Sequence, residues 1–164
     1  MKTPAGSASA ELEIRKSRFL ARLEPIAAPE DARRWVKVWR EEHPRARHVV
    51  HAFVLSREGV QTEGASDDGE PPGTGGRPVL ELLRSRGLTG VCVGVIRYFG
   101  GVLLGTGPLA RAYSDAAALA VEAAEWKEVI PGQNWSLTVV WGHRGVLERW
   151  AAVHGGSLRN WESS

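Results

Sequence analysis

The stretch VCVGVIRYF, Val91 to Phe99, is a nearly continuous apolar run. A strand with this pattern is typical of the middle of a sheet. Two other segments have strand patterns: residues 17–25 alternate apolar and polar side chains, and residues 47–56 are rich in β-branched side chains. Pro25 ends the first of them or places it at a sheet edge. The sequence therefore predicts a sheet with residues 91–99 at its centre.

Three segments have the spacing of helices. Residues 29–44 open with a proline and two acidic residues, place apolar side chains at helical intervals and stop at Pro44. Pro78 begins a short helix that ends at Gly87, and the alanine-rich residues 108–126 give the strongest helix prediction. Strands and helices alternate along the chain, so we expect a sandwich of one sheet with its helices on one face.

The composition of the 164 residues suits one folded domain, because 43% of them are apolar. The net charge of +2 and a pI near 9.0 permit an anionic partner without requiring one. The single cysteine, Cys92, excludes an internal disulfide. No segment approaches the ~18 consecutive apolar residues that span a bilayer, and the N-terminal residues are small and polar. We expect a cytoplasmic protein that binds no membrane, with a flexible segment at residues 1–13.

The composition changes after Pro131, where tryptophan becomes frequent. Residues 135–141 and 157–162 have strand patterns, and residues 145–155 between them have a helix pattern. One β-α-β unit of this size cannot bury its own faces. We expect residues 131–164 to dock on the preceding domain, to pair with another chain in a dimer, or to be a shortened form of something larger.

The polar loop SDDGEPPGTGGRP, Ser66 to Pro78, holds the carboxylates Asp67, Asp68 and Glu70. Hard cations take oxygen ligands, but the spacing does not match an EF-hand loop and no second ligand cluster accompanies it, so we expect no metal. Acid–base catalysis needs a desolvated carboxylate, and the only apolar residues in this loop are prolines. We therefore expect the carboxylates to accept hydrogen bonds from arginines of a second loop or from loop N–H groups.

That second loop is glycine-rich and lies within RYFGGVLLGTGPLAR, residues 97–111, between the central strand and the alanine-rich helix. Exposed N–H groups, the helix dipole and arginines at such a junction favour an anion site. The spacing matches neither a P-loop nor a dinucleotide-binding motif, so no nucleotide is implied. The glycines are equally consistent with turns that need a positive φ. Arg97 and Arg111 are the expected partners of the carboxylates.

Nothing else in the chain has the pattern of a catalytic site. The histidines are scattered, and His48 and His51 lie on opposite faces of one predicted strand, so they cannot bind one metal together. Cys92 lies in an apolar run and is expected to be a buried small side chain. We therefore predict no catalytic residues and no cofactor, and an enzyme is the less favoured class.

Three motifs carry a close resemblance to the IMPACT family, whose bacterial members are called YigZ-like. They are KSRF at Lys16 to Phe19, the polar loop at residues 66–78, and RYFGGVLLGTGPLARAYS at Arg97 to Ser114. The resemblance spans about residues 14 to 126. It implies an α+β domain over residues 14–130 with the fold of the second domain of ribosomal protein S5, a sheet with helices on one face.

The resemblance also implies a C-terminal domain like domain V of elongation factor G, which has a ferredoxin-like βαββαβ fold. Residues 131–164 supply about half of such a domain, one β-α-β. Two positions depart from the family pattern: Leu103 stands where lysine is usual, and Pro108 stands where glycine is usual. Losing a lysine weakens a phosphate-binding groove, whereas proline suits the first turn of a helix.

Eukaryotic relatives act in translational control, where they compete for an activator of a stress-responsive initiation-factor kinase. The resemblance therefore implies a binding protein linked to translation, which contacts RNA, the ribosome or a protein partner through the two glycine-rich loops. The second hypothesis is an enzyme, or a small-anion or nucleotide-binding protein, that uses the same loops as a phosphate site. The residues expected to form the site are Asp67, Asp68, Glu70, Gly73, Arg77, Arg97, Tyr98, Gly100, Gly101, Gly105, Gly107 and Arg111.

Overall fold

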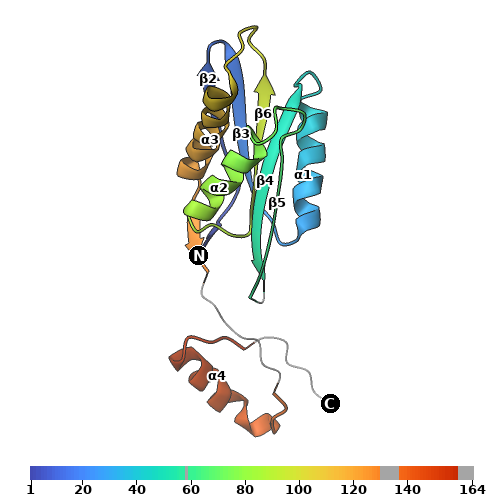
Figure 1. The fold of residues 1–164 in the computed structure, drawn as a ribbon. Coiled ribbons are helices and arrows are strands. Elements are labelled where there is room, and N and C mark those ends of the chain that lie inside the picture. The colour runs from blue at the N-terminus through green and yellow to red at the C-terminus, as the bar shows by residue number, and fades with distance from the viewer. Residues whose placement is uncertain (58, 130–136, 159–164) are drawn as a thin grey trace. The chain divides into compact units, whose positions relative to one another are not determined.

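A five-stranded antiparallel sheet forms the centre of the first of two units, Met1–Pro131 and Gly132–Ser164 (Figure 1). The computed structural model describes residues 1–57, 59–129 and 137–158. In chain order the elements are β1 (Lys2–Pro4), β2 (Ala8–Ile14), β3 (Ser17–Pro25), α1 (Pro29–Glu42), β4 (His48–Arg57), β5 (Val60–Ser66), α2 (Gly76–Ser85), β6 (Val91–Tyr98), α3 (Thr106–Ala123), β7 (Trp126–Glu128), a 3-10 helix (Trp141–His143) and α4 (Arg144–Val153).

The strand order in the sheet is β2-β3-β6-β4-β5, and every neighbouring pair is antiparallel. β6 therefore lies in the middle, which confirms the prediction for residues 91–99. Its side chains are buried up to the last residue because both faces of the strand are covered. In this register Arg97 pairs with Phe19 of β3 and with His48 of β4. The carboxyl end of β6 thus brings three segments of the chain together.

Helices cover both faces of the sheet, which corrects the expectation of helices on one face (Figure 1). α2 and α3 pack on the face that carries Phe19, Val50 and Val93. α1 packs on the other face, where Trp39 and Ile96 belong to a second buried cluster. Successive side chains of a strand point to opposite faces, so a strand that is apolar throughout needs a cover on each side.

The face under α1 is closely packed around β6. Trp39 lies directly over Gly94, because a Cβ at this glycine would come within 2.2 Å of the indole ring. Cys92 is fully buried on the same face, as predicted. Burial, with a smaller contribution from Glu24, raises the pKa of the Cys92 thiol to about 12.

Residues 1–13, which their polar composition predicts to be flexible, contain strand β1 and most of strand β2. β1 pairs with β7, and β2 forms a hairpin with β3. In β2 every second side chain packs against the core, from Ala8 to Ile14. A strand at the edge of a sheet with one solvated face needs only this alternation, so small, widely spaced apolar residues are enough to form it.

The helices begin and end close to the predicted residues. α1 ends two residues before Pro44, and α2 begins at Gly76 rather than at Pro78. Gly87 follows α2 with a φ of 63°, and the Leu88 N–H donates a hydrogen bond to the Leu83 carbonyl at 3.1 Å. The helix therefore ends in a Schellman motif, which confirms the predicted role of Gly87 at its C-terminus. β5 is an edge strand that the sequence patterns did not indicate, and it leads directly into the polar loop.

The second unit contains α4 and the 3-10 helix before it, and α4 confirms the predicted helix at residues 145–155. The predicted strand at residues 135–141 is wrong in its described part, because residues 137–140 have no regular structure. The rest of that segment and most of the predicted final strand lie outside the described residues. In the part of the chain that the structure describes, no helix combines the length and the apolar content needed to cross a membrane.

Candidate functional site

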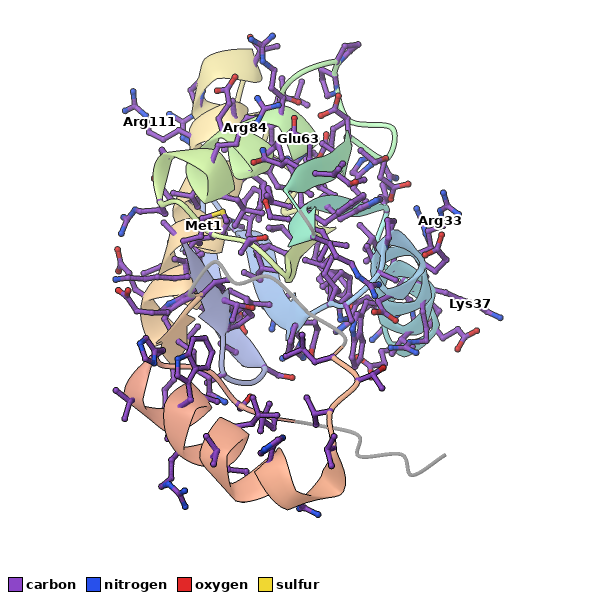
Figure 2. The ribbon with its side chains drawn as sticks, turned by 90° about the horizontal axis from the view of Figure 1, so that it is seen from below. Met1, Arg33, Lys37, Glu63, Arg84 and Arg111 are labelled. Atoms are coloured by element: carbon purple, nitrogen blue, oxygen red, sulfur yellow. The ribbon has the colours of Figure 1, made fainter. Side chains whose placement is uncertain are left out.

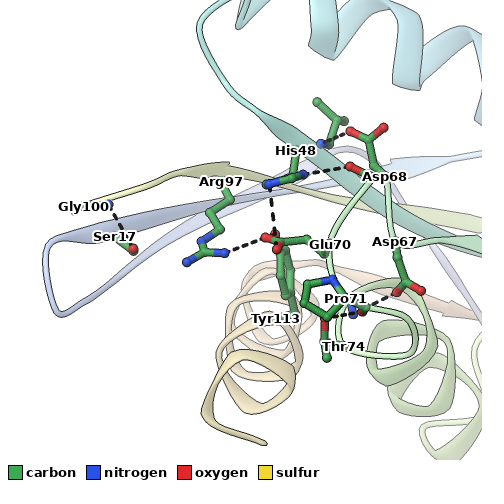
Figure 3. Close-up of polar contacts among 12 residues, drawn as sticks. Ser17, His48, Asp67, Asp68, Glu70, Pro71, Thr74, Arg97, Gly100 and Tyr113 are labelled. Atoms are coloured by element: carbon green, nitrogen blue, oxygen red, sulfur yellow. Dashed lines mark hydrogen bonds and ion pairs between the residues drawn. The ribbon is translucent and has the colours of Figure 1, made fainter. Parts of the chain in front are cut away.

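The three sequence motifs meet where β6 ends (Figure 3). Gly100 donates its backbone N–H to Ser17 Oγ at 3.1 Å, which joins the end of β6 to the start of β3. This contact needs glycine, because a Cβ at Gly100 would lie 2.1 Å from the carbonyl carbon of Lys16. From the other motif, Glu70 Oε1 accepts a hydrogen bond from Arg97 Nη1 at 2.7 Å. Residues 67–75 are called the acidic loop below, and residues 99–105 the apolar loop.

Glu70, Arg97 and Tyr113 form a buried polar cluster. Glu70 and Arg97 are only 7% and 6% exposed, and the Tyr113 hydroxyl donates a second hydrogen bond to Glu70 Oε1 at 2.6 Å. Burial raises the pKa of Tyr113, and the hydrogen bond to Glu70 raises it further, so the hydroxyl stays protonated and donates. The cluster ties the acidic loop to β6 and to α3.

Aromatic rings enclose the guanidinium of Arg97. Its Cζ lies 5.5 Å from the centroid of the Phe19 ring and 5.6 Å from that of Phe99. Tyr113 packs edge-on against Phe19, with 5.2 Å between the ring centroids. The expectation that no carboxylate of the acidic loop is desolvated is therefore wrong for Glu70. The hydrogen-bond partners of Glu70 come from β6 and α3, so the composition of its own loop does not reveal this burial.

Asp67 caps the N-terminus of α2 from the acidic loop. Its Oδ1 accepts the backbone N–H groups of Gly75 and Gly76 at 2.9 Å each, and its Oδ2 accepts that of Gly73 at 2.8 Å. Burial raises the pKa of this carboxyl, but the three N–H groups outweigh burial and hold the pKa below its usual range. The predicted contact between a carboxylate and loop N–H groups is present at Asp67. Gly73 serves this turn with a φ of 78°.

Asp68 joins the acidic loop to the other side of the sheet. Its side chain forms an ion pair with Arg40 of α1 and accepts the Val49 N–H at 2.5 Å. Its main-chain oxygen lies 2.8 Å from Nδ1 of His48, whose Nε2 is 3.8 Å from Glu70 Oε2. The predicted contact with Arg97 is thus made by Glu70, and Asp67 and Asp68 have other partners.

A groove of about 380 Å³ opens beside the buried cluster. We call it the β6 groove. Its polar lining residues come from four parts of the chain, and its apolar ones mainly from the apolar loop and α3. The lining consists of Arg47, His48, Glu70, Pro71, Arg97, Phe99, Leu103, Leu104, Gly105, Thr106 and Leu109.

The N-terminus of α3 faces the β6 groove without a cap. Gly105 stands at the N-cap position with a φ of 82° and has no capping side chain. No described residue accepts a hydrogen bond from the backbone N–H of Thr106 or Gly107, and the next residue, Pro108, has no N–H. Among the described residues, Arg97 donates only through Nη1, and its buried Nε has no partner. The arrangement is suited to binding an anion.

Several other predicted site residues do not line this groove. Tyr98 points to the opposite face, where its hydroxyl lies 2.8 Å from His43 Nδ1 and its ring lines a second groove with Arg18 and Arg45. Arg77 pairs with Glu81 along α2. Arg111 is exposed on α3 (Figure 2). The predicted glycines that line neither groove are Gly73, Gly100, Gly101 and Gly107.

No three His, Cys, Asp or Glu side chains of the described residues gather closely enough to hold a metal ion. The carboxylates of the acidic loop instead have backbone N–H groups, arginines and a tyrosine as partners. Within the β6 groove Glu70 is paired with Arg97, so the positive groups that remain for a ligand are Arg47 and the open N-terminus of α3.

The fold and the groove define an α+β domain with a candidate anion site. The chain belongs to the IMPACT family, because the Impact N-terminal domain matches residues 15–121. An IMPACT family member of Haemophilus influenzae is 43% identical over 124 residues, which are 74% of this chain and 60% of that protein. YigZ of Escherichia coli is 38% identical over 82% of this chain and 66% of its own length. YvyE of Bacillus subtilis is 40% identical over 85% of this chain and 54% of its own length.

The chain therefore spans about 54 to 66% of the length of these relatives. Among solved structures, the crystal structure of a hypothetical protein matches 99% of this chain and 80% of its own, with a TM-score of 0.78 and 34% identity. The two-domain translational regulator Yih1 matches 73% of this chain and 48% of its own, with a TM-score of 0.51 and 25% identity. The predicted family and the α+β class are confirmed, and the likeness to ribosomal protein S5 stays a prediction.

Proposed function

We propose that this chain is a non-catalytic binding protein of translational control that contacts RNA through the β6 groove. Membership of the IMPACT family and the likeness to the translational regulator Yih1 support the link to translation. The RNA is either free or part of the ribosome. The proposal concerns the domain formed by β1 to β7, which holds the groove.

The open N-terminus of α3 beside two arginines is the observation that carries the proposal. Phosphate groups bind at helix N-termini because the N–H groups point at them and the helix dipole favours negative charge. Arg47 is exposed at the rim of the groove, whereas Arg97 is buried in its wall. A phosphate in the groove would therefore meet one exposed and one buried guanidinium, and Arg side chains match phosphate geometry well.

More basic side chains lie near the end of β6. Arg15 and Lys16 form the turn between β2 and β3, and the backbone of Lys16 contacts Gly100 at the start of the apolar loop. Arg45 lies in the loop before β4 and lines the second groove. All three side chains are exposed, and none has an ion-pair partner among the described residues. Such groups supply the sequence-independent attraction to a phosphate backbone.

The substitution Arg47→Ala tests this proposal without touching the core. We expect weaker binding of a single-stranded RNA in filter-binding titrations. We also expect the slope of log affinity against log salt concentration to fall by about 0.7, the value for one lost phosphate contact. Arg33→Ala is the matched control, because Arg33 is an exposed arginine on α1 that lines neither groove (Figure 2). Equal losses in the two variants would argue against the groove.

A protein partner is the alternative outcome of the same titration. If the wild-type chain shows no salt-dependent binding of RNA, the RNA proposal is wrong and a protein contact is favoured. A pull-down from native lysate, with ribosomes scored separately from other proteins, then identifies what the domain binds.

A further inference from the structure

We infer that the β6 groove receives one unpaired nucleotide, with its phosphate at the N-terminus of α3 and its base against the apolar loop. The inference rests on the proposed function and makes it more specific, because it names the form of RNA that is bound. A domain with such a site binds single-stranded RNA in preference to a duplex.

The apolar loop gives the groove a wall that nothing in the described part of the chain covers. Phe99 is 43% exposed and Leu103 is 83% exposed, and both line the groove. The side chains of Leu104 and Leu109 are nearly buried and continue this wall inward. Large apolar side chains that are exposed together mark a surface that binds something.

The Phe99 ring has Arg97 near one face and is 43% exposed. Arg97 lies 5.6 Å from its centroid, and Phe99 takes part in none of the ring pairs among the described residues. A base gains about as much from stacking on one aromatic ring as from a good hydrogen bond, whatever its identity. The ring therefore suits a nucleobase without selecting a particular one.

The phosphate end of the site rests on two independent features. The first is the uncapped N-terminus of the 18-residue helix α3, with free N–H groups at Thr106 and Gly107. The second is Arg97, which is only 6% exposed, lines the groove and has an Nε without a hydrogen-bond partner. Buried donors without a partner are uncommon in folded proteins, and a phosphate oxygen near Arg97 would supply one.

The size of the groove limits what enters it. A volume of about 380 Å³ lies near the lower end of the roughly 300–1,000 Å³ found for small-molecule sites. This is room for one nucleotide rather than for a helix of paired ones. A base inside a duplex is stacked on both faces and cannot reach a wall such as Phe99 unless it leaves the stack.

The test compares two RNAs of equal length, one unstructured and one that forms a perfect hairpin, in salt titrations with the full chain. We expect the wild type to bind the unstructured RNA at least tenfold more tightly. Phe99→Ala and, separately, Leu103→Ala are expected to weaken this binding, with a loss of about tenfold for the lost stack at Phe99. The salt slope stays unchanged because no charge is removed. Val60→Ala is the control, because Val60 is 65% exposed on β5 and lines no part of the groove.

Each outcome has a distinct meaning. Equal affinity for the two RNAs, or equal losses on both in the Phe99 and Leu103 variants, overturns the inference but leaves the proposed function standing. Binding of neither RNA by the wild type overturns both. Leu103→Ala keeps the test decisive if Phe99→Ala fails to fold, since Leu103 is 83% exposed.

A second measurement separates a nucleotide of an RNA chain from a free nucleotide. Thermal unfolding is followed with a nucleoside monophosphate, the matching nucleoside, and inorganic phosphate. We expect the monophosphate to raise the unfolding temperature more than either part alone, and the effect to be lost in Leu103→Ala and Arg47→Ala. Stabilisation without RNA binding assigns the groove to free nucleotides and contradicts the proposed function. No stabilisation by any compound, together with equal binding of both RNAs, overturns the inference.

Discussion

Helices α2 and α3 both start after a glycine-rich loop, yet their N-termini differ. At α2 the carboxylate of Asp67 accepts the N–H groups of Gly75 and Gly76. At α3 the N-cap is Gly105, and no side chain of the described residues closes the first turn. One helix carries its own anion, and the other leaves an equivalent position open at a groove with two arginines.

The difference assigns separate roles to loops that look alike in sequence. The acidic loop directs its carboxylates inward, to α2, to α1 and to the buried Arg97, so it acts as a support. The apolar loop exposes Phe99 and Leu103 to solvent, so it is the part available to a ligand. Glu70 connects the two loops, because its partner Arg97 lies near the end of β6, two residues before the apolar loop begins.

Glu70→Ala breaks that connection and has the largest expected effect. It leaves the buried Arg97 without a counter-charge and the Tyr113 hydroxyl without an acceptor. We expect the free energy of unfolding, measured in urea, to fall by about 3 to 5 kcal/mol. Glu81→Ala is the control, since its pair with Arg77 is exposed and is worth at most about 1 kcal/mol. Similar losses in the two variants would mean that the cluster contributes nothing beyond a surface pair.

Asp67→Asn opens the N-terminus of α2 and has the next largest effect. We expect a loss of about 2 kcal/mol at pH 7, because an amide replaces a charged acceptor of three N–H groups. The pKa of Asp67 is lower in the folded chain than in the unfolded one. Its stabilisation is therefore present above the unfolded pKa of about 4 and is lost as the pH falls through the folded pKa. The difference between wild type and variant in urea unfolding should shrink below about pH 4, and a difference independent of pH would refute this role.

Thr106→Asp is the reverse change, because it gives α3 an acid in its first turn. An acidic residue at this end of a helix stabilises it by about 0.3 to 1 kcal/mol, while the same charge repels phosphate from the groove. We expect a slightly higher free energy of unfolding together with weaker RNA binding. Thr106→Asn, which adds no charge, should change RNA binding much less. If Thr106→Asp binds RNA as well as the wild type, no phosphate lies at this helix end.

The sequence predicts the central strand, the three helices of the first unit and the contact between the acidic loop and Arg97. These features depend on local patterns, such as the apolar run around Val93 and the alanines of α3. The position of α1 on the second face was not predicted, although the same apolar run requires a cover on both sides. The N-terminal strands were missed because a sheet edge needs so few apolar residues.

The chemistry of the site was harder to predict than the fold. Glu70 is buried against Arg97 of β6 and Tyr113 of α3, which are far from it in sequence and meet it only because α3 packs on the sheet. Tyr98 and Arg97 line different grooves, because consecutive side chains of a strand point to opposite faces of the sheet. Arg47 was missed because it belongs to none of the three motifs. It lines the groove because it immediately precedes β4, which pairs with β6.

Cys92 gives the domain an internal reporter. It is the single cysteine of the chain, it is fully buried in the central strand, and its pKa of about 12 keeps the thiol protonated near neutral pH. A thiol reagent can therefore modify it only when the sheet opens around β6. The rate of modification measures how often the core of the wild-type protein or of any variant opens, without an added label.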